Sequence, residues 1–226
     1  MHAVVLDLFG TLVDAPASTD RSHTAARLAR VIGCDPATVV RYFLASWQIR
    51  HDGTLPTVEA LARHMVRTVG GPTSVVGTVT DKLRARARAR LVPDASVTHA
   101  LISLRLAGYR IGVLSDASAD IAAAWPGSPL ATIVDAAVLS CATGCTKPDQ
   151  RLYARISDTL GVAAHQVLYC GDGGGDELQG AVDHGMSAVA VRRRGAADAL
   201  VFGDKPWPGP NICSVERLQE YLAARR

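Results

Sequence analysis

Cysteine is scarce in this chain of 226 residues, and the number of cysteines is odd. No two of them form a C-x-x-C pair, and no further histidine or cysteine pair completes Cys141 and Cys145 into a four-ligand metal site. The pattern excludes a disulfide-rich secreted scaffold and predicts free thiols in a reducing compartment. The five cysteines are Cys34, Cys141, Cys145, Cys170 and Cys213.

Long apolar runs are also absent. No segment approaches the roughly 20 apolar residues of a membrane span, and the N-terminus enters a strand pattern without a basic leader. We therefore expect a cytoplasmic protein with no membrane partner.

A strong excess of charge is missing as well, because the formal net charge is only +3. A basic cluster holds Arg84, Arg86, Arg88 and Arg90, and alternate positions on a helix point in different directions around its axis. We interpret the cluster as a solvated helix face and expect no nucleic-acid partner.

The residues that are present suffice for an ordinary core, with 48% apolar and 20% charged. After an initial strand, strand patterns disappear for about 75 residues, and apolar residues recur at helical spacing. The recurrences cover residues 25–32, 40–47, 58–69 and 74–91. We predict that residues 15–92 form an all-helical cap inserted into the rest of the chain.

From residue 93 onward, predicted strands and helices alternate. This alternation is typical of parallel β-α-β units, so we predict an α/β fold. Its core is a Rossmann-like parallel sheet built from residues 1–14 and 93–226. The predicted strands are 110–114, 133–139, 166–170 and 188–191, and the predicted helices are 94–107, 149–160, 176–184 and 214–224.

The most informative run is VVLDLFGTL at residues 4–12. Apolar residues lead directly into Asp7, and Gly10 lets the chain turn soon afterwards. In open α/β sheets, ligands bind outside the carboxyl ends of strands. Asp7 is therefore a candidate nucleophile or metal ligand.

Further polar groups follow other predicted strands or precede helices. Ser115 ends the strand at 110–114, Lys147 precedes Pro148, and Asp172 and Asp176 enclose three glycines. Carboxylates gathered beside Asp7 would form the oxygen-only pocket that Mg²⁺ prefers. Their mutual repulsion calls for a cation to offset it.

In chain order, these motifs resemble those of the haloacid dehalogenase superfamily of hydrolases. The resemblance rests on Asp7-x-x-Gly10-Thr11, Ser115, Lys147-Pro148 and Gly171-Asp172-(x)3-Asp176. The helical insert also looks like the C1-type cap of that superfamily. The resemblance covers nearly the whole chain.

The resemblance implies a role for each matched position. Asp7 would attack phosphorus to form an aspartyl-phosphate, and Lys147 would offset charge on the phosphate and on Asp7. Ser115, with Thr11 and Asp116 nearby, would contact the substrate. The Mg²⁺ ligands would be Asp7, the backbone carbonyl of Phe9, Asp172 and, as a supporting carboxylate, Asp176.

Phe9 departs from the pattern, because phosphatases of this superfamily usually carry a second Asp two residues after the nucleophile. That Asp protonates the leaving group, which a phenyl ring cannot do. Our main hypothesis is a Mg²⁺-dependent hydrolase of a small phosphorylated metabolite, as a monomer or homodimer. The alternatives are a metal-free 2-haloacid dehalogenase, a C–P hydrolase and a non-catalytic phosphate-binding protein.

Overall fold

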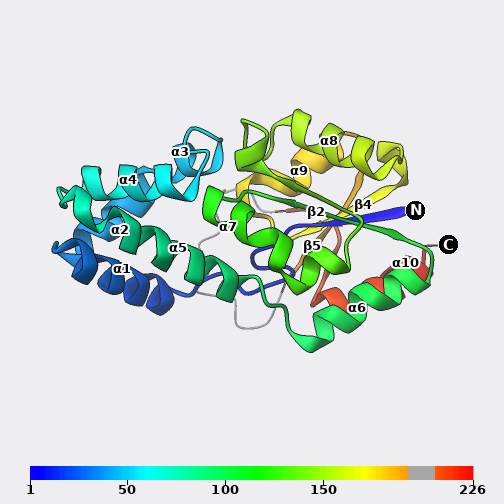
Figure 1. The fold of residues 1–226 in the computed structure, drawn as a ribbon. Helices are drawn as coiled ribbons and strands as arrows, with labels where there is room; N and C mark the ends of the chain where they lie inside the picture. Colours follow the sequence, from blue (N-terminus) through cyan, green and yellow to red (C-terminus); the bar gives the residue numbers. More distant parts are fainter. Residues whose placement is uncertain (193–206, 226) are drawn as a thin grey trace.

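A computed structural model describes residues 1–192 and 207–225 of the chain. It has two parts: a sheet with helices on both faces, and a group of helices beside it (Figure 1). The predicted α/β fold with a Rossmann-like parallel sheet and a helical cap is confirmed. The predicted core segment 93–226 includes residues 193–206 and 226, which lie outside the described residues.

The sheet has the strand order β3-β2-β1-β4-β5-β6, and every described pair is parallel. The chain first builds outward from β1 through β2 to β3, and then continues on the other side of β1 with β4. The order therefore reverses between β1 and β4, which is where open α/β sheets bind ligands. The strands are β1 (Ala3–Leu6), β2 (Arg110–Ser115), β3 (Ala136–Leu139), β4 (Val167–Gly171), β5 (Ser187–Val191) and β6 (Asn211–Ile212).

Both faces of the sheet are buried, which explains the nearly continuous apolar strands. Alternate residues of a strand point to opposite faces. Val4 and Leu6 accordingly join one hydrophobic cluster, and Ala3 and Val5 join the other.

Helices α6, α7 and α10 pack on the face of Val4, and α8 and α9 pack on the face of Val5 (Figure 1). Gly112 of β2 allows close packing of α8, because a Cβ at this position would lie 2.9 Å from a methyl group of Leu160. The bounds are α6 (Ala95–Leu106), α7 (Ala119–Ala124), α8 (Gln150–Leu160), α9 (Glu177–Asp183) and α10 (Leu218–Ala223).

The helical part has its own core, made of buried residues between Ala25 and Leu83. It contains five α-helices where the sequence predicts four, because the chain leaves the helix at Ser46, whose Oγ donates to the Tyr42 carbonyl at 2.6 Å. The helices are α1 (Ser18–Ile32), α2 (Pro36–Ala45), α3 (Trp47–His51), α4 (Val58–Thr68) and α5 (Val76–Arg90).

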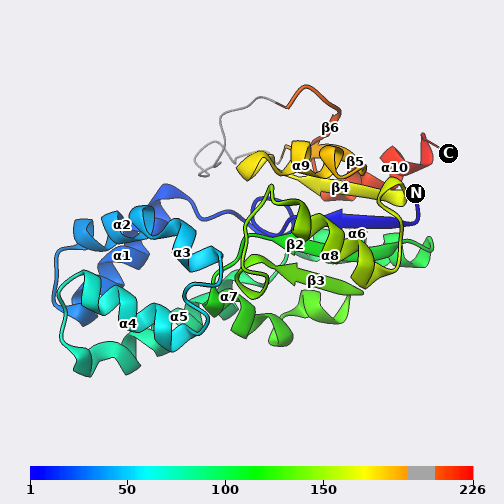
Figure 2. The same cartoon turned by 90° about the horizontal axis from the view of Figure 1, so that it is seen from above.

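The two parts meet along α5. Ala87, at its C-terminal end, and Leu91, just after it, belong to the hydrophobic cluster of the sheet, whereas Leu83 belongs to the cluster of the helical part. Seen from above, the strands run from the N-terminus toward the helices of this part (Figure 2). The carboxyl ends of the strands therefore face the junction. The boundaries proposed at residues 14 and 92 stay a prediction.

Two predicted elements differ in the structure. The strand expected at 133–139 begins only at Ala136, because the 3-10 turn η3 (Pro129–Thr132) and the turn after it precede it. The last helix begins at Leu218 after a 3-10 turn, and the Ser214 side chain makes no capping hydrogen bond. Among the described residues, no helix combines the length and apolar character needed to cross a membrane.

Candidate active site

Four of the predicted site residues lie at the carboxyl ends of β1, β2 and β4, at and beside the point where the strand order reverses. Asp7 directly follows β1, and its N–H donates to the Cys170 carbonyl of β4 at 2.8 Å. Asp172 directly follows β4, Ser115 ends β2, and Asp116 comes next. Parallel pairing brings all of these strand ends to one edge of the sheet.

Lys147 reaches this edge from the loop before α8 and is itself buried. Its Nζ donates to Asp7 Oδ1 at 2.7 Å and also to Glu177 Oε2. Asp116 holds the backbone of this loop, because its Oδ1 accepts the Lys147 N–H at 3.0 Å. Asp116 thus positions the lysine that contacts Asp7.

Glu177 is the site residue that the sequence reasoning missed. Its side chain is fully buried; Oε2 accepts from the Tyr169 hydroxyl at 2.8 Å, and Oε1 accepts from the Gly173 N–H at 2.9 Å. The motif in the sequence predicts Asp176, three residues after the glycine run begins, as the supporting carboxylate. The sequence does contain a signal for Glu177, since a second acidic residue directly follows Asp176. Glu177 is also the first residue of α9, and the first turn of this helix faces the strand ends.

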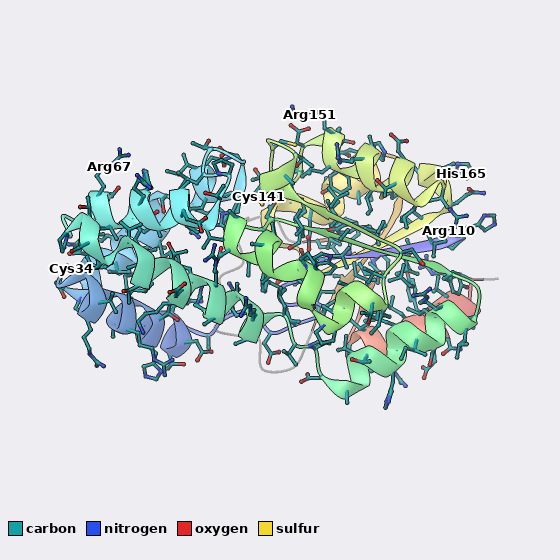
Figure 3. The ribbon with its side chains drawn as sticks, in the orientation of Figure 1. Cys34, Arg67, Arg110, Cys141, Arg151 and His165 are labelled. Atoms are coloured by element: carbon teal, nitrogen blue, oxygen red, sulfur yellow. The ribbon has the colours of Figure 1, made fainter. Side chains whose placement is uncertain are left out.

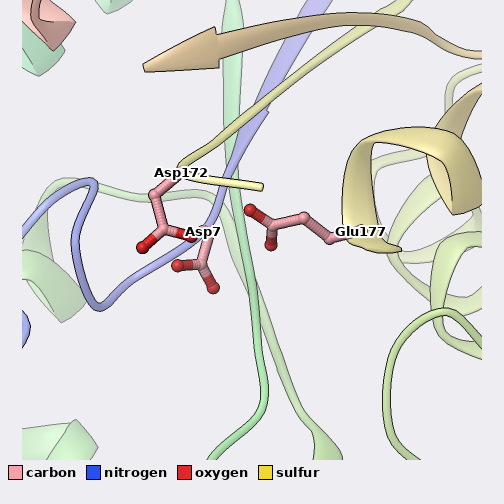
Figure 4. Close-up of side chains that lie close together, drawn as sticks. All are labelled: Asp7, Asp172 and Glu177. Atoms are coloured by element: carbon pink, nitrogen blue, oxygen red, sulfur yellow. The ribbon is translucent and has the colours of Figure 1, made fainter. Parts of the chain in front are cut away.

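Asp7, Asp172 and Glu177 point toward one another (Figure 4). Each offers an oxygen atom, and the three oxygens lie within 4.8 Å of one another. Two glycines provide the space: a Cβ on Gly10 would overlap with Asp172 Oδ2, and a Cβ on Gly171 would overlap with Glu177 Oε1. This donor set fits a hard divalent cation such as Mg²⁺.

The carboxylates repel one another in this buried setting. Burial raises the pKa of Glu177 to about 8, and the charges of Asp7 and Asp172 add to this effect while Lys147 opposes it. Burial and the charge of Asp7 likewise raise the pKa of Asp172. Burial alone lowers the pKa of Lys147, but its carboxylate neighbours raise it well above its usual value. Lys147 and, for Asp172, Arg192 therefore offset only part of the negative charge.

Two predicted site residues lie outside this group. Asp176 has a left-handed backbone (φ 53°) before α9, and its carboxylate is not among the three that converge. Thr11 is fully buried; its Oγ1 has no hydrogen-bond partner among the described residues, and it does not line the cavity over Asp7. The substrate contact predicted for Thr11 therefore has no support in the geometry.

A cavity of about 520 Å³ lies between the carboxylate edge and the helical part. Asp7, Ser115, Asp116 and Lys147 form its polar floor, and Phe9 lies beside them. Volumes of this size are typical of small-molecule sites. The apolar lining includes Val40, Phe43, Leu44, Trp47, Leu61, Leu83 and Ile121.

The arginine cluster of α5 is divided between two environments, so the interpretation as a solvated face is wrong for half of it. Arg84 is exposed and pairs with Glu59, and Arg88 is also exposed. Arg86 and Arg90, four residues apart, are half-buried and line the cavity. Burial, with the charge of Arg86 next, lowers the pKa of Arg90 to about 9.

Comparisons with known proteins identify the family of this chain. The model of the family described as haloacid dehalogenase-like hydrolase matches residues 1–185. Among characterised proteins, (S)-2-haloacid dehalogenase 4A of Burkholderia cepacia is 27% identical over 206 residues, covering 86% of this chain and 84% of the relative.

Solved structures show the same fold in two kinds of enzyme. L-2-haloacid dehalogenase from Xanthobacter autotrophicus, with chloropropionic acid covalently bound, has a TM-score of 0.68 at 19% identity, and both chains are covered completely. A HAD phosphatase from Thermococcus onnurineus has a TM-score of 0.65 at 19% identity, with 98% of each chain covered. The same fold is therefore found in a haloacid dehalogenase and in a phosphatase.

Proposed function

Because the chain belongs to the haloacid dehalogenase-like hydrolase family, we propose that it is a Mg²⁺-dependent hydrolase of a small phosphorylated metabolite. The convergence of Asp7, Asp172 and Glu177 around the single ammonium group of Lys147 is the observation that supports this proposal most strongly. Without a cation, the repulsion would be relieved by protonation of a buried carboxyl, in line with the raised pKa of Glu177, whereas a bound divalent cation would keep all three groups ionised.

The three carboxylates, together with the predicted backbone carbonyl of Phe9, would hold the ion, and Glu177 takes the place that the sequence gave to Asp176. Bound there, Mg²⁺ would neutralise carboxylate charge and orient phosphoryl oxygens.

In the proposed reaction, an oxygen of Asp7 attacks phosphorus and the bond to the leaving oxygen breaks, which leaves an aspartyl-phosphate. Water then hydrolyses this intermediate to phosphate and restores Asp7. Lys147 keeps Asp7 oriented through the 2.7 Å hydrogen bond and offsets charge on the transferred group. Ser115, which lines the cavity, would donate to a phosphoryl oxygen.

Phe9 cannot protonate the leaving oxygen, so the proposal favours substrates whose leaving group is already a weak base, such as acyl phosphates or aryl phosphates. Lys147, together with a cation held by the carboxylates, would lower the barrier by stabilising negative charge rather than by transferring a proton.

A second candidate is a 2-haloacid dehalogenase. Phe9 and the apolar cavity lining favour it, as does the 27% identical relative. In that reaction Asp7 would displace halide from carbon and no metal would be required. In such a site Glu177 would still hold Lys147 through its hydrogen bond, but Asp172 has no evident use.

Two parallel assays distinguish the candidates. Chelator-treated protein is offered acetyl phosphate and p-nitrophenyl phosphate with and without Mg²⁺, and 2-chloropropionate under the same conditions. We expect phosphate release that requires Mg²⁺ and is lost in Asp7→Asn, while the exposed Asp158→Asn control keeps it. Halide release without metal would establish the dehalogenase instead. Turnover of neither substrate class, with phosphate still binding, would indicate a non-catalytic protein.

A further inference from the structure

The cavity over Asp7 contains a second polar region, opposite in charge to the carboxylates. Arg86 and Arg90 lie one turn apart on α5, and Arg50 comes from α3. All three line the cavity and are half-buried. We call these three side chains the arginine group.

The protein supplies little negative charge to this group. Asp120, in the first turn of α7, is the one carboxylate whose charge acts on all three arginines among the described residues, while Asp20, which is exposed, acts on Arg86. Asp120 already accepts a hydrogen bond from Ser118 Oγ at 2.5 Å. Three positive charges therefore share one buried carboxylate.

Direct partners are also few. Arg50 donates to the Phe43 carbonyl at 2.9 Å and to Ser46 Oγ at 3.1 Å. Within residues 1–192 and 207–225, no carboxylate oxygen lies within 4.0 Å of a guanidinium nitrogen of Arg86 or Arg90. Arg90 instead lies over the ring of Phe9.

Such an arrangement is costly without a ligand, because a charge in apolar surroundings needs a partner of opposite sign. A guanidinium group suits a carboxylate or a phosphoryl group, each of which accepts two parallel hydrogen bonds. The cavity has room for a molecule that reaches from Asp7 to this region.

We propose that the arginine group binds a second oxyanion of the substrate, a carboxylate or a phosphoryl group, while the reacting group lies at Asp7. This inference rests on the proposed function and narrows it: the substrate is a small organic phosphate with a further acidic group at its other end. The apolar side chains that line the same cavity contact the carbon chain that joins the two acidic groups.

The test measures binding without turnover. Isothermal titration calorimetry compares alkylphosphonates of two to four carbons whose far end carries a methyl, a carboxylate or a second phosphonate. At the chain length that fits, we expect an acidic far end to bind about tenfold or more tightly than the methyl end, as charge-assisted hydrogen bonds contribute. The carboxylate and phosphonate series show which oxyanion the group prefers.

Variants assign the effect to the arginine group. Arg86→Gln and Arg90→Gln should each remove most of the preference, whereas Arg88→Gln, which removes the same charge from the exposed face of α5, should keep it. Arg86→Lys retains a charge and should keep part of the preference, so the result does not depend on the folding of one variant. Thermal unfolding checks that each variant is folded.

Equal affinity for all three series at every length would overturn the inference, as would a preference that survives in both glutamine variants. A failure of the proposed function would be seen in a different experiment, the hydrolysis assay. If no phosphate ester or acyl phosphate is hydrolysed with Mg²⁺, the same titrations on metal-free protein still show whether the arginine group selects an oxyanion.

Discussion

The guanidinium carbon of Arg90 lies 4.0 Å from the centroid of the Phe9 ring. Phe9 thus occupies the position expected for the general acid, with a cation against its face. A cation–π contact of this kind stabilises by about 0.5–2 kcal/mol. If Phe9 is replaced by an acidic residue to supply a general acid, the positive charge of Arg90 remains beside the new carboxyl group.

The first prediction concerns this pair. Phe9→Asp alone should raise phosphatase activity little, because Arg90 would hold the new carboxyl in its ionised form, which cannot donate a proton. Phe9→Asp combined with Arg90→Gln should raise kcat on alkyl phosphates further, within the 10²–10⁴-fold range of general acid catalysis. Steady-state assays on alkyl and aryl phosphates, with Arg90→Gln alone as the control, measure this. A full gain from Phe9→Asp alone would show that Arg90 does not interfere.

The second prediction separates the two neighbouring acidic residues after the glycine run. Glu177→Gln should weaken Mg²⁺ binding about tenfold or more, because it removes one of three converging carboxylates. Asp176→Asn is the matched control and should change Mg²⁺ affinity much less. Calorimetric titration with Mg²⁺ measures both. If Asp176→Asn weakened Mg²⁺ binding more than Glu177→Gln, Asp176 rather than Glu177 would be the supporting metal ligand.

The third prediction concerns the glycine that makes room for Glu177. Gly171→Ala should lower the free energy of unfolding by roughly 1–3 kcal/mol, because the added Cβ overlaps with a fully buried carboxylate. Gly77→Ala is the control: nothing lies within 4 Å of the added Cβ on α5, so helix propensity should stabilise the protein by about 0.5–1 kcal/mol. Urea unfolding compares the two, and equal effects would refute the crowding argument.

The fourth prediction concerns pH and His51. Its ring stacks on Trp47, with centroids 4.7 Å apart, and Nδ1 lies 2.6 Å from the Trp47 carbonyl oxygen. Burial lowers the pKa of His51 to about 3, aided by Arg50 and Arg90, while the Trp47 carbonyl and Asp52 oppose the shift.

Because the folded protein keeps this ring neutral, the unfolded chain binds the proton first as the pH falls below about 6.5. The stability contributed by His51 is therefore present above that pH and is lost as the pH falls toward 3. At pH 5 the loss in the free energy of unfolding amounts to about 2 kcal/mol. His51→Gln should flatten the fall in the urea midpoint between pH 7 and pH 5. His165, which lies at the surface (Figure 3), provides the control, and His165→Gln should leave that fall unchanged.

The sequence by itself determined the strand ends that carry the site. An apolar run that stops at a polar residue is a local signal, so it placed Asp7, Ser115 and Asp172 at one edge of a parallel sheet. Lys147 was identifiable because it precedes a proline at a helix start in a chain with few lysines. The helical insert was also predictable, because helical periodicity over successive segments is a local property.

Only the tertiary structure decided between Asp176 and Glu177. Asp176 has a left-handed backbone conformation, and α9 begins at the next residue, Glu177. In this arrangement the carboxylate of Glu177 accepts a hydrogen bond from Lys147. A difference of one residue in a glycine-rich loop has no periodic signal. Likewise, Arg86 and Arg90 line the cavity because α5 packs against the sheet with that side inward, and this packing depends on residues distant in the sequence.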